Sequence, residues 1–168
     1  APWVKRCLDG LKSSTISTSI VIVDNNSRDN TVEIIKTSYP EVALIENQEN
    51  LGFGKANNIG ISYALKKGAD YFFLLNQDAW IFPDTLQTLI NANKINPQYL
   101  IISPVHLNRT SDKLDYNFIR YIKKSNELIN DLIIRKNAQK DIYFLPFINA
   151  AFWLLSKKCI LEIGGFDP

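Results

Sequence analysis

Polar residues gather directly after three apolar segments, where ligand-binding loops are found in α/β proteins. These polar clusters cover residues 24–29, 46–58 and 76–78. Ligands of open parallel sheets bind beyond the carboxyl ends of the strands, so we expect the three clusters to meet at one rim. Asn, Asp and Ser are also ordinary turn formers and caps, and that structural role is the alternative for each cluster.

The middle cluster contains a glycine turn, Gly52-Phe53-Gly54, which leads into a segment of helical periodicity. A glycine turn feeding a helix N-terminus can accept a phosphate, and Lys55 places a positive charge there. Asn57 stands where the dinucleotide-binding fingerprint requires glycine, and no Walker A loop is present. The cluster therefore predicts a phosphate site outside these two motif classes, or a plain tight turn.

Asp78 is the candidate metal ligand of the third cluster, Asn76-Gln77-Asp78. It follows residues 71–75, which are wholly apolar and are expected to form a strand buried on both faces. A carboxylate after such a strand costs free energy unless it caps a turn or binds a ligand. A hard oxygen ligand suits Mg²⁺ or Mn²⁺. The sequence predicts either a divalent cation at Asp78 or a turn cap.

Net charge and cysteine content argue against several other functions. The 19 basic and 17 acidic residues of the 168-residue chain leave a formal charge of +2. No basic block occurs, so nucleic-acid binding is not indicated. Cys7 and Cys159 are too far apart for a zinc motif and too few for a disulfide framework, which indicates a reducing compartment. With no apolar run long enough to span a membrane and no secretory pattern, a cytoplasmic location is expected.

Two other residue types invite a functional interpretation. His106 is the single histidine, and no Ser or Cys motif accompanies it. A surface position or a satisfied structural role is therefore expected for it rather than the role of a general base. Trp80 and Trp153 are expected to be packing residues, although an aromatic ring near a strand end could stack on a sugar.

The clusters need alternating strands and helices to position them. Short apolar or β-branched runs predict strands over residues 19–23, 42–45, 71–75 and 100–103. Amphipathic periodicity and capping residues predict helices over residues 2–13 and 54–67, from Asn30 to before Pro40, and from Pro83 onward. This alternation is typical of βαβ units and a mostly parallel sheet.

Residues 105–140 interrupt the alternation, because they are polar, rich in Asn and Lys, and only weakly periodic. We predict a variable insertion there, within a single domain that spans residues 1–168. Order is expected to return over residues 142–147 and 150–155. A short helix should then begin at Ser156 and end at Gly164-Gly165.

Four ordered motifs resemble those of glycosyltransferase family 2, the inverting enzymes of the GT-A fold, and especially their rhamnosyltransferase-like branch. The matching segments are residues 20–31, 50–60, 73–78 and 164–168. The resemblance implies an α/β fold of Rossmann type, a three-layer sandwich with a mostly parallel central sheet. Relative to the family pattern, the first strand and a later acidic motif are missing, so the domain is expected to be incomplete at both ends.

The same resemblance implies roles for individual residues. Asp24 would bind the base of the donor, and Lys55 would lie near its diphosphate. Asn76 replaces the first acid of the metal motif, so Asp78 would carry most of the coordination. The donor-binding residues implied are Asp24, Asn26, Ser27, Gly54, Lys55, Asn58 and Asn76. The acceptor-side residues implied are Ala151, Trp153 and Asp167. The catalytic base is expected beyond Pro168.

By resemblance, the protein transfers a sugar from a UDP- or dTDP-sugar to a hydroxyl of a glycan, polysaccharide or lipid-linked saccharide. The anomeric carbon would invert in one displacement, with Mg²⁺ or Mn²⁺ stabilising the leaving diphosphate and a carboxylate deprotonating the acceptor. A lipid-linked acceptor would bring the protein to the inner face of a membrane as a peripheral enzyme. The alternative is a nucleotide-sugar-binding module or an inactive remnant without a base. A nucleotidyltransferase is disfavoured, because the glycine-rich, Arg-containing loop of that class is not seen.

Overall fold

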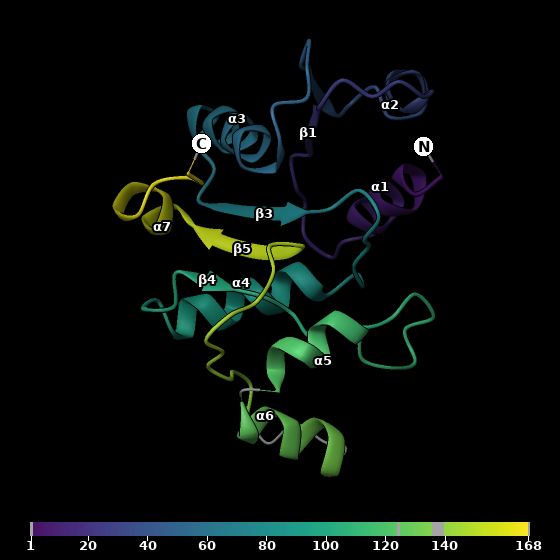
Figure 1. The fold of residues 1–168 in the computed structure, drawn as a ribbon. Coiled ribbons are helices and arrows are strands. Elements are labelled where there is room, and N and C mark those ends of the chain that lie inside the picture. The colour runs from purple at the N-terminus through teal and green to yellow at the C-terminus, as the bar shows by residue number, and fades with distance from the viewer. Residues whose placement is uncertain (1, 124, 136–139, 168) are drawn as a thin grey trace.

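The computed structural model describes residues 2–123, 125–135 and 140–167. Strands and helices alternate through its first half, as the apolar pattern predicts (Figure 1). The strands are β1 (Val21–Asp24), β2 (Ala43–Glu46), β3 (Tyr71–Leu75), β4 (Ile101–Ile102) and β5 (Phe152–Ser156). The helices are α1 (Val4–Lys12), α2 (Thr31–Ser38), α3 (Phe53–Lys66), α4 (Thr85–Ile95), α5 (Tyr116–Ile122), α6 (Asn126–Ile129), the π-helix η1 (Asn130–Ile134) and α7 (Lys157–Glu162).

The strands form two small sheets. β1 pairs with β2 in parallel, and Asp24 lies opposite Glu46 at their carboxyl ends. The second sheet has the order β3-β5-β4, and β5 runs antiparallel to both neighbours, so β3 and β4 share one direction. Regular structure is expected from the sequence over residues 142–147 and 150–155. Residues 142–147 form neither helix nor strand, whereas β5 overlaps the second segment. Pro146 and the exposed rings of Phe144 and Phe147 fit an irregular segment.

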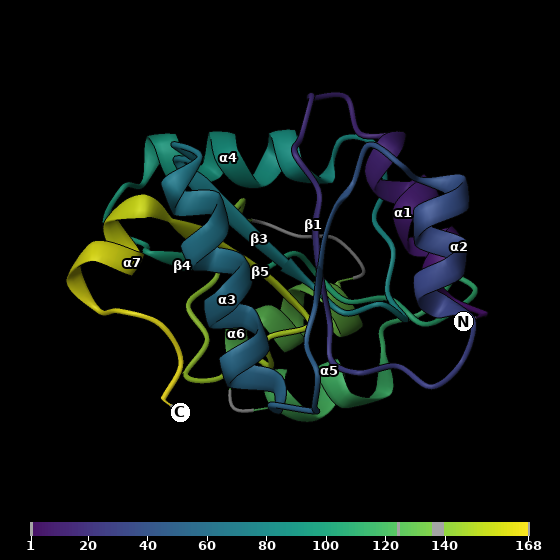
Figure 2. The ribbon, with the colours of Figure 1, turned by 90° about the horizontal axis from the view of Figure 1, so that it is seen from above.

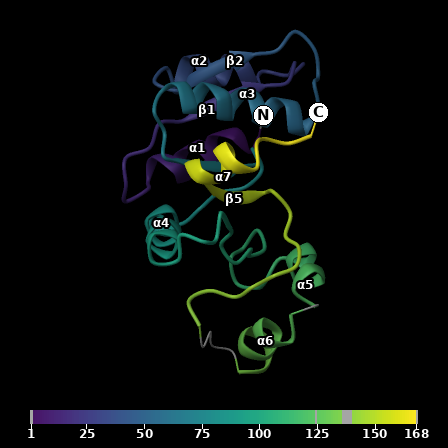
Figure 3. The ribbon, with the colours of Figure 1, turned by 90° about the vertical axis from the view of Figure 1, so that its left-hand side faces the viewer.

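Two hydrophobic clusters hold the helices on these sheets. α1 and α2 pack against β1 and β2 through Val4, Leu8, Ile35, Tyr39 and Val42. α3 and α7 pack against β3 and β5 through Ile61, Phe72, Leu74, Leu155 and Cys159. Figures 1 and 3 place α3 and α4 on opposite sides of β3 and β5, which gives the helix–sheet–helix layering expected of the α/β fold. Each buried Val, Leu, Ile or Phe side chain among them contributes roughly 1.5–3 kcal/mol of transfer free energy.

α5, α6 and η1 form a satellite to the layered core. Figures 1 and 3 both place α5 and α6 away from the sheets, at the far end from α2. Phe118, Ile122 and Leu128 make a hydrophobic cluster of their own there. The satellite lies within the part of the chain where we expected an insertion. The boundaries 105–140 themselves stay a prediction.

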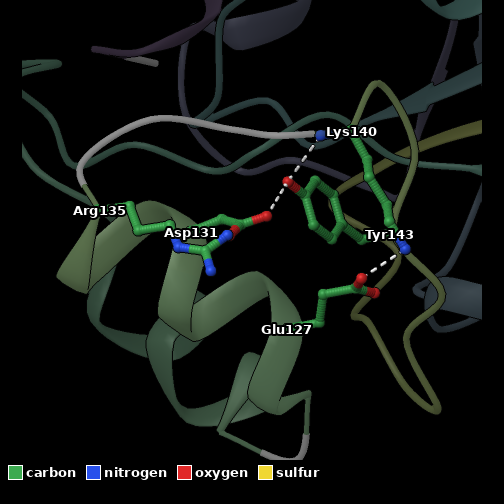
Figure 4. A network of polar contacts seen from close by, with 5 residues as sticks. All are labelled: Glu127, Asp131, Arg135, Lys140 and Tyr143. Carbon is green, nitrogen blue, oxygen red and sulfur yellow. Dashed lines mark hydrogen bonds and ion pairs between the residues drawn. The ribbon is translucent and has the colours of Figure 1, made fainter.

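A polar network ties the segment after the satellite back to η1 (Figure 4). The carboxylate of Asp131 is 3% exposed; it accepts a 2.6 Å hydrogen bond from the Tyr143 hydroxyl and a 3.0 Å bond from Arg135. The same hydroxyl accepts from the backbone N–H of Lys140, whose side chain forms an ion pair with Glu127. A buried charge is tolerated only with such partners, so the network anchors this segment.

Replacing Tyr143 with Phe should therefore lower the free energy of unfolding by about 1–3 kcal/mol, because a buried carboxylate loses a donor. Urea denaturation followed by circular dichroism measures the change. Tyr116→Phe is the matched control, since the Tyr116 side chain is 72% exposed. Equal losses in the two variants would contradict a special role for the network.

Candidate functional site

The loop after β1 begins with a buried carboxylate. Asp24 is 6% exposed, and its Oδ2 accepts a 3.0 Å hydrogen bond from the backbone N–H of Ser27. Between them, Asn26 takes a left-handed conformation with φ of 65°, which Asn tolerates better than most residues. The side chains of Asn26 and Ser27 are exposed. Asp24 thus shapes a tight turn whose outer side chains face solvent at the end of the strand.

Asn25 joins this loop to the loop after β2. Its Nδ2 donates to Asn50 Oδ1 (2.9 Å) and to the carbonyl of Gly52 (3.2 Å). Its Oδ1 accepts from Asn47 Nδ2 and from the backbone N–H of Leu51, both at 3.1 Å. Sequence reasoning did not single out Asn25, because an Asn after a strand resembles any turn former. The abundance of Asn in both loops was the available signal.

The second loop delivers the chain into the N-terminus of α3. Gly52 has a φ of 81°, which strongly favours glycine. No acidic residue occupies the first turn of the helix, and the exposed Lys55 does. Helix N-termini favour anions because their first N–H groups lack intrahelical partners. The arrangement is suited to a phosphate group.

The third loop is a turn at the end of β3. The N–H of Ala79 donates to the carbonyl of Asn76 (3.0 Å), and the N–H of Asn76 donates to the carbonyl of Ala151 (3.3 Å). Asn76 and Asp78 have exposed side chains. Within the part of the chain that the structure describes, no hydrogen bond or ion pair engages the Asp78 carboxylate. A capping bond, the structural alternative for Asp78, is therefore not formed.

Helix α1 contacts this turn through Cys7. The thiol of Cys7 lies 3.7 Å from the carbonyl oxygen of Asn76. Burial, and to a lesser degree the charge of Asp78, raises the pKa of Cys7 to about 11. Cys7 is therefore a neutral thiol, consistent with the structural role that its burial indicates.

The ends of the strands meet at one edge. β1 and β2 end together, and Figure 2 shows β3 running toward the edge of the molecule at which α3 begins. The last described residues lie near the same edge: the carbonyl of Asp167 is close to Gly54 in the first turn of α3 (Figure 2). The predicted convergence of the three clusters therefore agrees with the arrangement of the elements.

A divalent cation at this edge would have few protein ligands. Among the described residues, no group of three or more His, Cys, Asp or Glu side chains gathers. Asp78 with the neutral Asn76 fits a cation that takes its remaining ligands from substrate phosphates, as Mg²⁺ commonly does. The donor set is suited to a cation shared with a diphosphate.

The remaining predicted residues lie on β5 and the last segment of the chain. Trp153 packs its indole parallel to the ring of Phe166, with centroids 5.9 Å apart. Asp167 is exposed, and Ala151 is half-buried beside Asn76. Asn58 turns its amide toward the backbone of Phe166. Contacts with donor or acceptor stay predictions for all of them.

His106 is buried, which agrees with the structural role and not with the surface position, the two possibilities that the sequence left open. Its Nε2 lies 3.0 Å from the hydroxyl of Ser103, and its ring packs against Phe118 and Phe152. Burial lowers its pKa to about 4, and the opposing charge of Asp115 is the smaller effect. His106 is therefore neutral at physiological pH.

None of the helices within the described ranges has the length and apolar character needed to cross a bilayer.

The sequence and fold match a known family and several of its relatives. The model of glycosyl transferase family 2 matches residues 1–163. The dTDP-rhamnosyl transferase RfbF of Shigella flexneri is 36% identical over 110 residues, which are 63% of this chain and 34% of that protein. Chondroitin synthase of Pasteurella multocida is 31% identical over 91 residues, 52% of this chain and 9% of that enzyme. The chain thus spans about a third or less of these two relatives.

Solved structures share the fold at lower identity. The mannosyltransferase PcManGT from Pyrobaculum calidifontis, solved with GDP-Man and Mn²⁺, superimposes with a TM-score of 0.67 and 20% identity. The S. aureus TarS 1–349 structure in complex with UDP gives 0.66 and 15%. Each match covers 99% of this chain, but 44% and 46% of the respective solved chains. These likenesses confirm the GT-A-like fold.

Proposed function

Since the chain belongs to glycosyl transferase family 2, we propose that it forms the donor-binding part of an enzyme that transfers a sugar, with inversion, from a UDP- or dTDP-sugar to an acceptor hydroxyl. The observation that supports the proposal is that β1 and β2 end together and that β3, a strand of the second sheet, runs toward the same edge of the molecule (Figure 2). There, a buried Asp24, the N-terminus of α3 and the Asp78 carboxylate follow successive strands, and no described residue hydrogen-bonds or forms an ion pair with that carboxylate. Such an edge is the usual ligand site of an open α/β sheet.

The chain's own side chains would divide the donor between them. Asp24 would bind the nucleoside, whose base and ribose carry hydrogen-bond donors. The N–H groups at the start of α3, together with Lys55, would bind the diphosphate. Asp78 and Asn76 would hold Mg²⁺ or Mn²⁺, which supplies positive charge opposite the leaving diphosphate. Asn26, Ser27 and Gly54 complete the proposed donor side. No catalytic base is assigned.

The acceptor, location and partners are proposed more broadly. We infer a saccharide or lipid-linked saccharide as acceptor, contacted near Ala151, Trp153 and Asp167. Two buried free thiols, Cys7 and Cys159, support a reducing cytoplasmic compartment. A peripheral position at the inner face of a membrane would follow from a lipid-linked acceptor. The name of the RfbF relative favours dTDP-rhamnose as the first donor to test.

Calorimetric titration with UDP, dTDP and GDP, with and without Mn²⁺, tests the donor site. We expect UDP or dTDP to bind in the presence of Mn²⁺ and to bind at least about tenfold more weakly without it. Failure of all three nucleotides to bind folded protein would overturn the proposed site. Turnover of dTDP-rhamnose or a UDP-sugar separates an enzyme from the alternative, a binding module without a base.

Lys55→Ala should weaken UDP or dTDP binding by about tenfold, because one charge-assisted contact to the diphosphate is lost. Uridine and thymidine, which lack phosphates, should bind the variant and the wild type alike. Lys66→Ala is the matched control, since Lys66 is an exposed lysine in the last turn of the same helix. Equal effects of the two substitutions would argue against a phosphate contact at Lys55.

A further inference from the structure

The side-chain amide of Asn58 pairs with the backbone of a residue 108 positions later in the chain. Its Nδ2 donates to the carbonyl of Phe166, and its Oδ1 accepts from the N–H of Phe166, both at 2.8 Å. One amide thus satisfies both backbone groups of a single residue. An Asn side chain offers this donor and acceptor side by side, whereas an ionised Asp of the same size offers acceptors only.

Two glycines allow the chain to approach α3 this closely. A Cβ added at Gly165 would lie 2.9 Å from Cγ of Asn58 and closer still to its Oδ1. A Cβ at Gly54 would lie 3.1 Å from the carbonyl oxygen of Asp167 and from Cβ of Phe166. A Cβ atom does not come within 3.0 Å of a heavy atom of a distant residue in real proteins, so glycine is required at position 165 for as long as Asn58 keeps its position.

The ring of Phe166 fixes the same segment from its other side. It meets Phe53 edge to face with centroids 5.5 Å apart, and it stacks on Trp153 at 5.9 Å. Aromatic pairs at such separations stabilise beyond their buried area. Residues 164–167, here called the C-terminal turn, are thereby attached to both α3 and β5.

The C-terminal turn lies against the first turn of α3, where the proposed function places the donor's diphosphate. Gly54 belongs to that helical turn and meets Phe166 and Asp167. The carboxylate of Asp167 is exposed and has no hydrogen bond or ion pair with the described residues. The position of the C-terminal turn therefore decides where Asp167 lies relative to the helix N-terminus that is proposed to bind phosphate.

We propose that Asn58 is a positioning residue, which holds the C-terminal turn against α3 and thereby sets the diphosphate site and the place of Asp167, rather than touching the donor itself. The effect on the donor rests on the proposed function, whereas the attachment of the turn does not. Asn58 acts through the Phe166 backbone. Its loss should change the order of residues 164–167 before it changes the core.

Amide hydrogen exchange at Phe166 tests the attachment. Asn58→Ala and Gly165→Ala should each speed exchange by at least about tenfold, because one removes the pairing and the other displaces it. The double variant should exchange like Asn58→Ala alone, since the added methyl group then meets no amide. Asn57→Ala is the control, as the Asn57 amide donates to Phe53 within the helix. Unchanged exchange in Asn58→Ala, or multiplied effects in the double variant, would overturn the proposal.

Asn58→Asp supplies a second readout, because it tests the hydrogen-bond pairing itself. An ionised carboxylate can accept from the Phe166 N–H but repels the Phe166 carbonyl, whereas a protonated carboxyl can donate to it. Protection of Phe166 in this variant should therefore be low at pH 7 and should rise at pH 4.5, relative to wild type at each pH. Protection that does not respond to pH would contradict the paired geometry.

Nucleotide titration tests the effect on the donor. Asn58→Ala should bind UDP or dTDP about tenfold more weakly than wild type, because the C-terminal turn is no longer held in place beside the proposed diphosphate site. Binding of uridine and thymidine should not change. Weakening of the nucleosides to the same degree would instead indicate direct contact between Asn58 and the donor, and would overturn the positioning role. If wild type binds no nucleotide, the proposed function fails, and the exchange results alone decide the attachment.

Discussion

Replacing Asp78 with Ala is expected to reduce Mn²⁺-dependent binding of UDP or dTDP by about 100-fold or more. Removing a residue that only hydrogen-bonds to a metal ligand typically lowers metal affinity by about 10–100-fold. Removing a ligand should cost more, and Asp78 would be the one charged ligand in its loop. Asn76, the neutral residue of the same motif, cannot replace the lost charge. Nucleotide binding measured without metal should change little, because the carboxylate acts through the cation.

The fold of this variant should be nearly intact. Asp78 is exposed and makes no capping bond to any residue that the structure describes, so the free energy of unfolding should change by less than about 0.5 kcal/mol. Asp84→Ala is the matched control, since Asp84 is an exposed residue of the next loop whose side chain caps nothing. A large loss of thermal stability with undiminished nucleotide binding would show that Asp78 is structural.

The elements that carry the site could be predicted because their signals are local. The β-branched residues before Asp24 and the apolar run of residues 71–75 identify β1 and β3 from a few neighbouring side chains. The glycine turn before Lys55 marks the start of α3 in the same way. Because parallel strands place their ends at one edge, the rim of the site follows from these elements alone.

Contacts between distant segments could not be predicted from the same patterns. The four hydrogen bonds of Asn25, and the pairing of Asn58 in α3 with Phe166, depend on which distant segments folding brings together. The antiparallel direction of β5 likewise depends on the path of the satellite before it. An Asn in a polar loop has the same appearance whether its amide meets solvent, a ligand or another backbone.

Acidification should destabilise the protein through His106, with a sign that its burial determines. The native pKa is about 4, and the reference value of 6.5 applies when the chain is unfolded. Between these values the unfolded state binds the extra proton, so the stabilising contribution is complete above pH 6.5 and is lost as the pH falls toward 4. At about 1.36 kcal/mol for each unit of pKa difference, on the order of 2–3 kcal/mol should be lost by pH 4.5.

His106→Gln separates this effect from the titration of carboxylates. Gln keeps a polar group that can reach the Ser103 hydroxyl but has no titrating ring, so its stability should fall less between pH 7.5 and 4.5 than that of wild type. Urea denaturation at both pH values gives the difference, to which carboxylates common to both proteins contribute equally. The ring must stay neutral between Phe118 and Phe152 for the effect to appear. A His106 resonance that titrates near 6.5 in the native state would therefore contradict both the burial and the predicted loss.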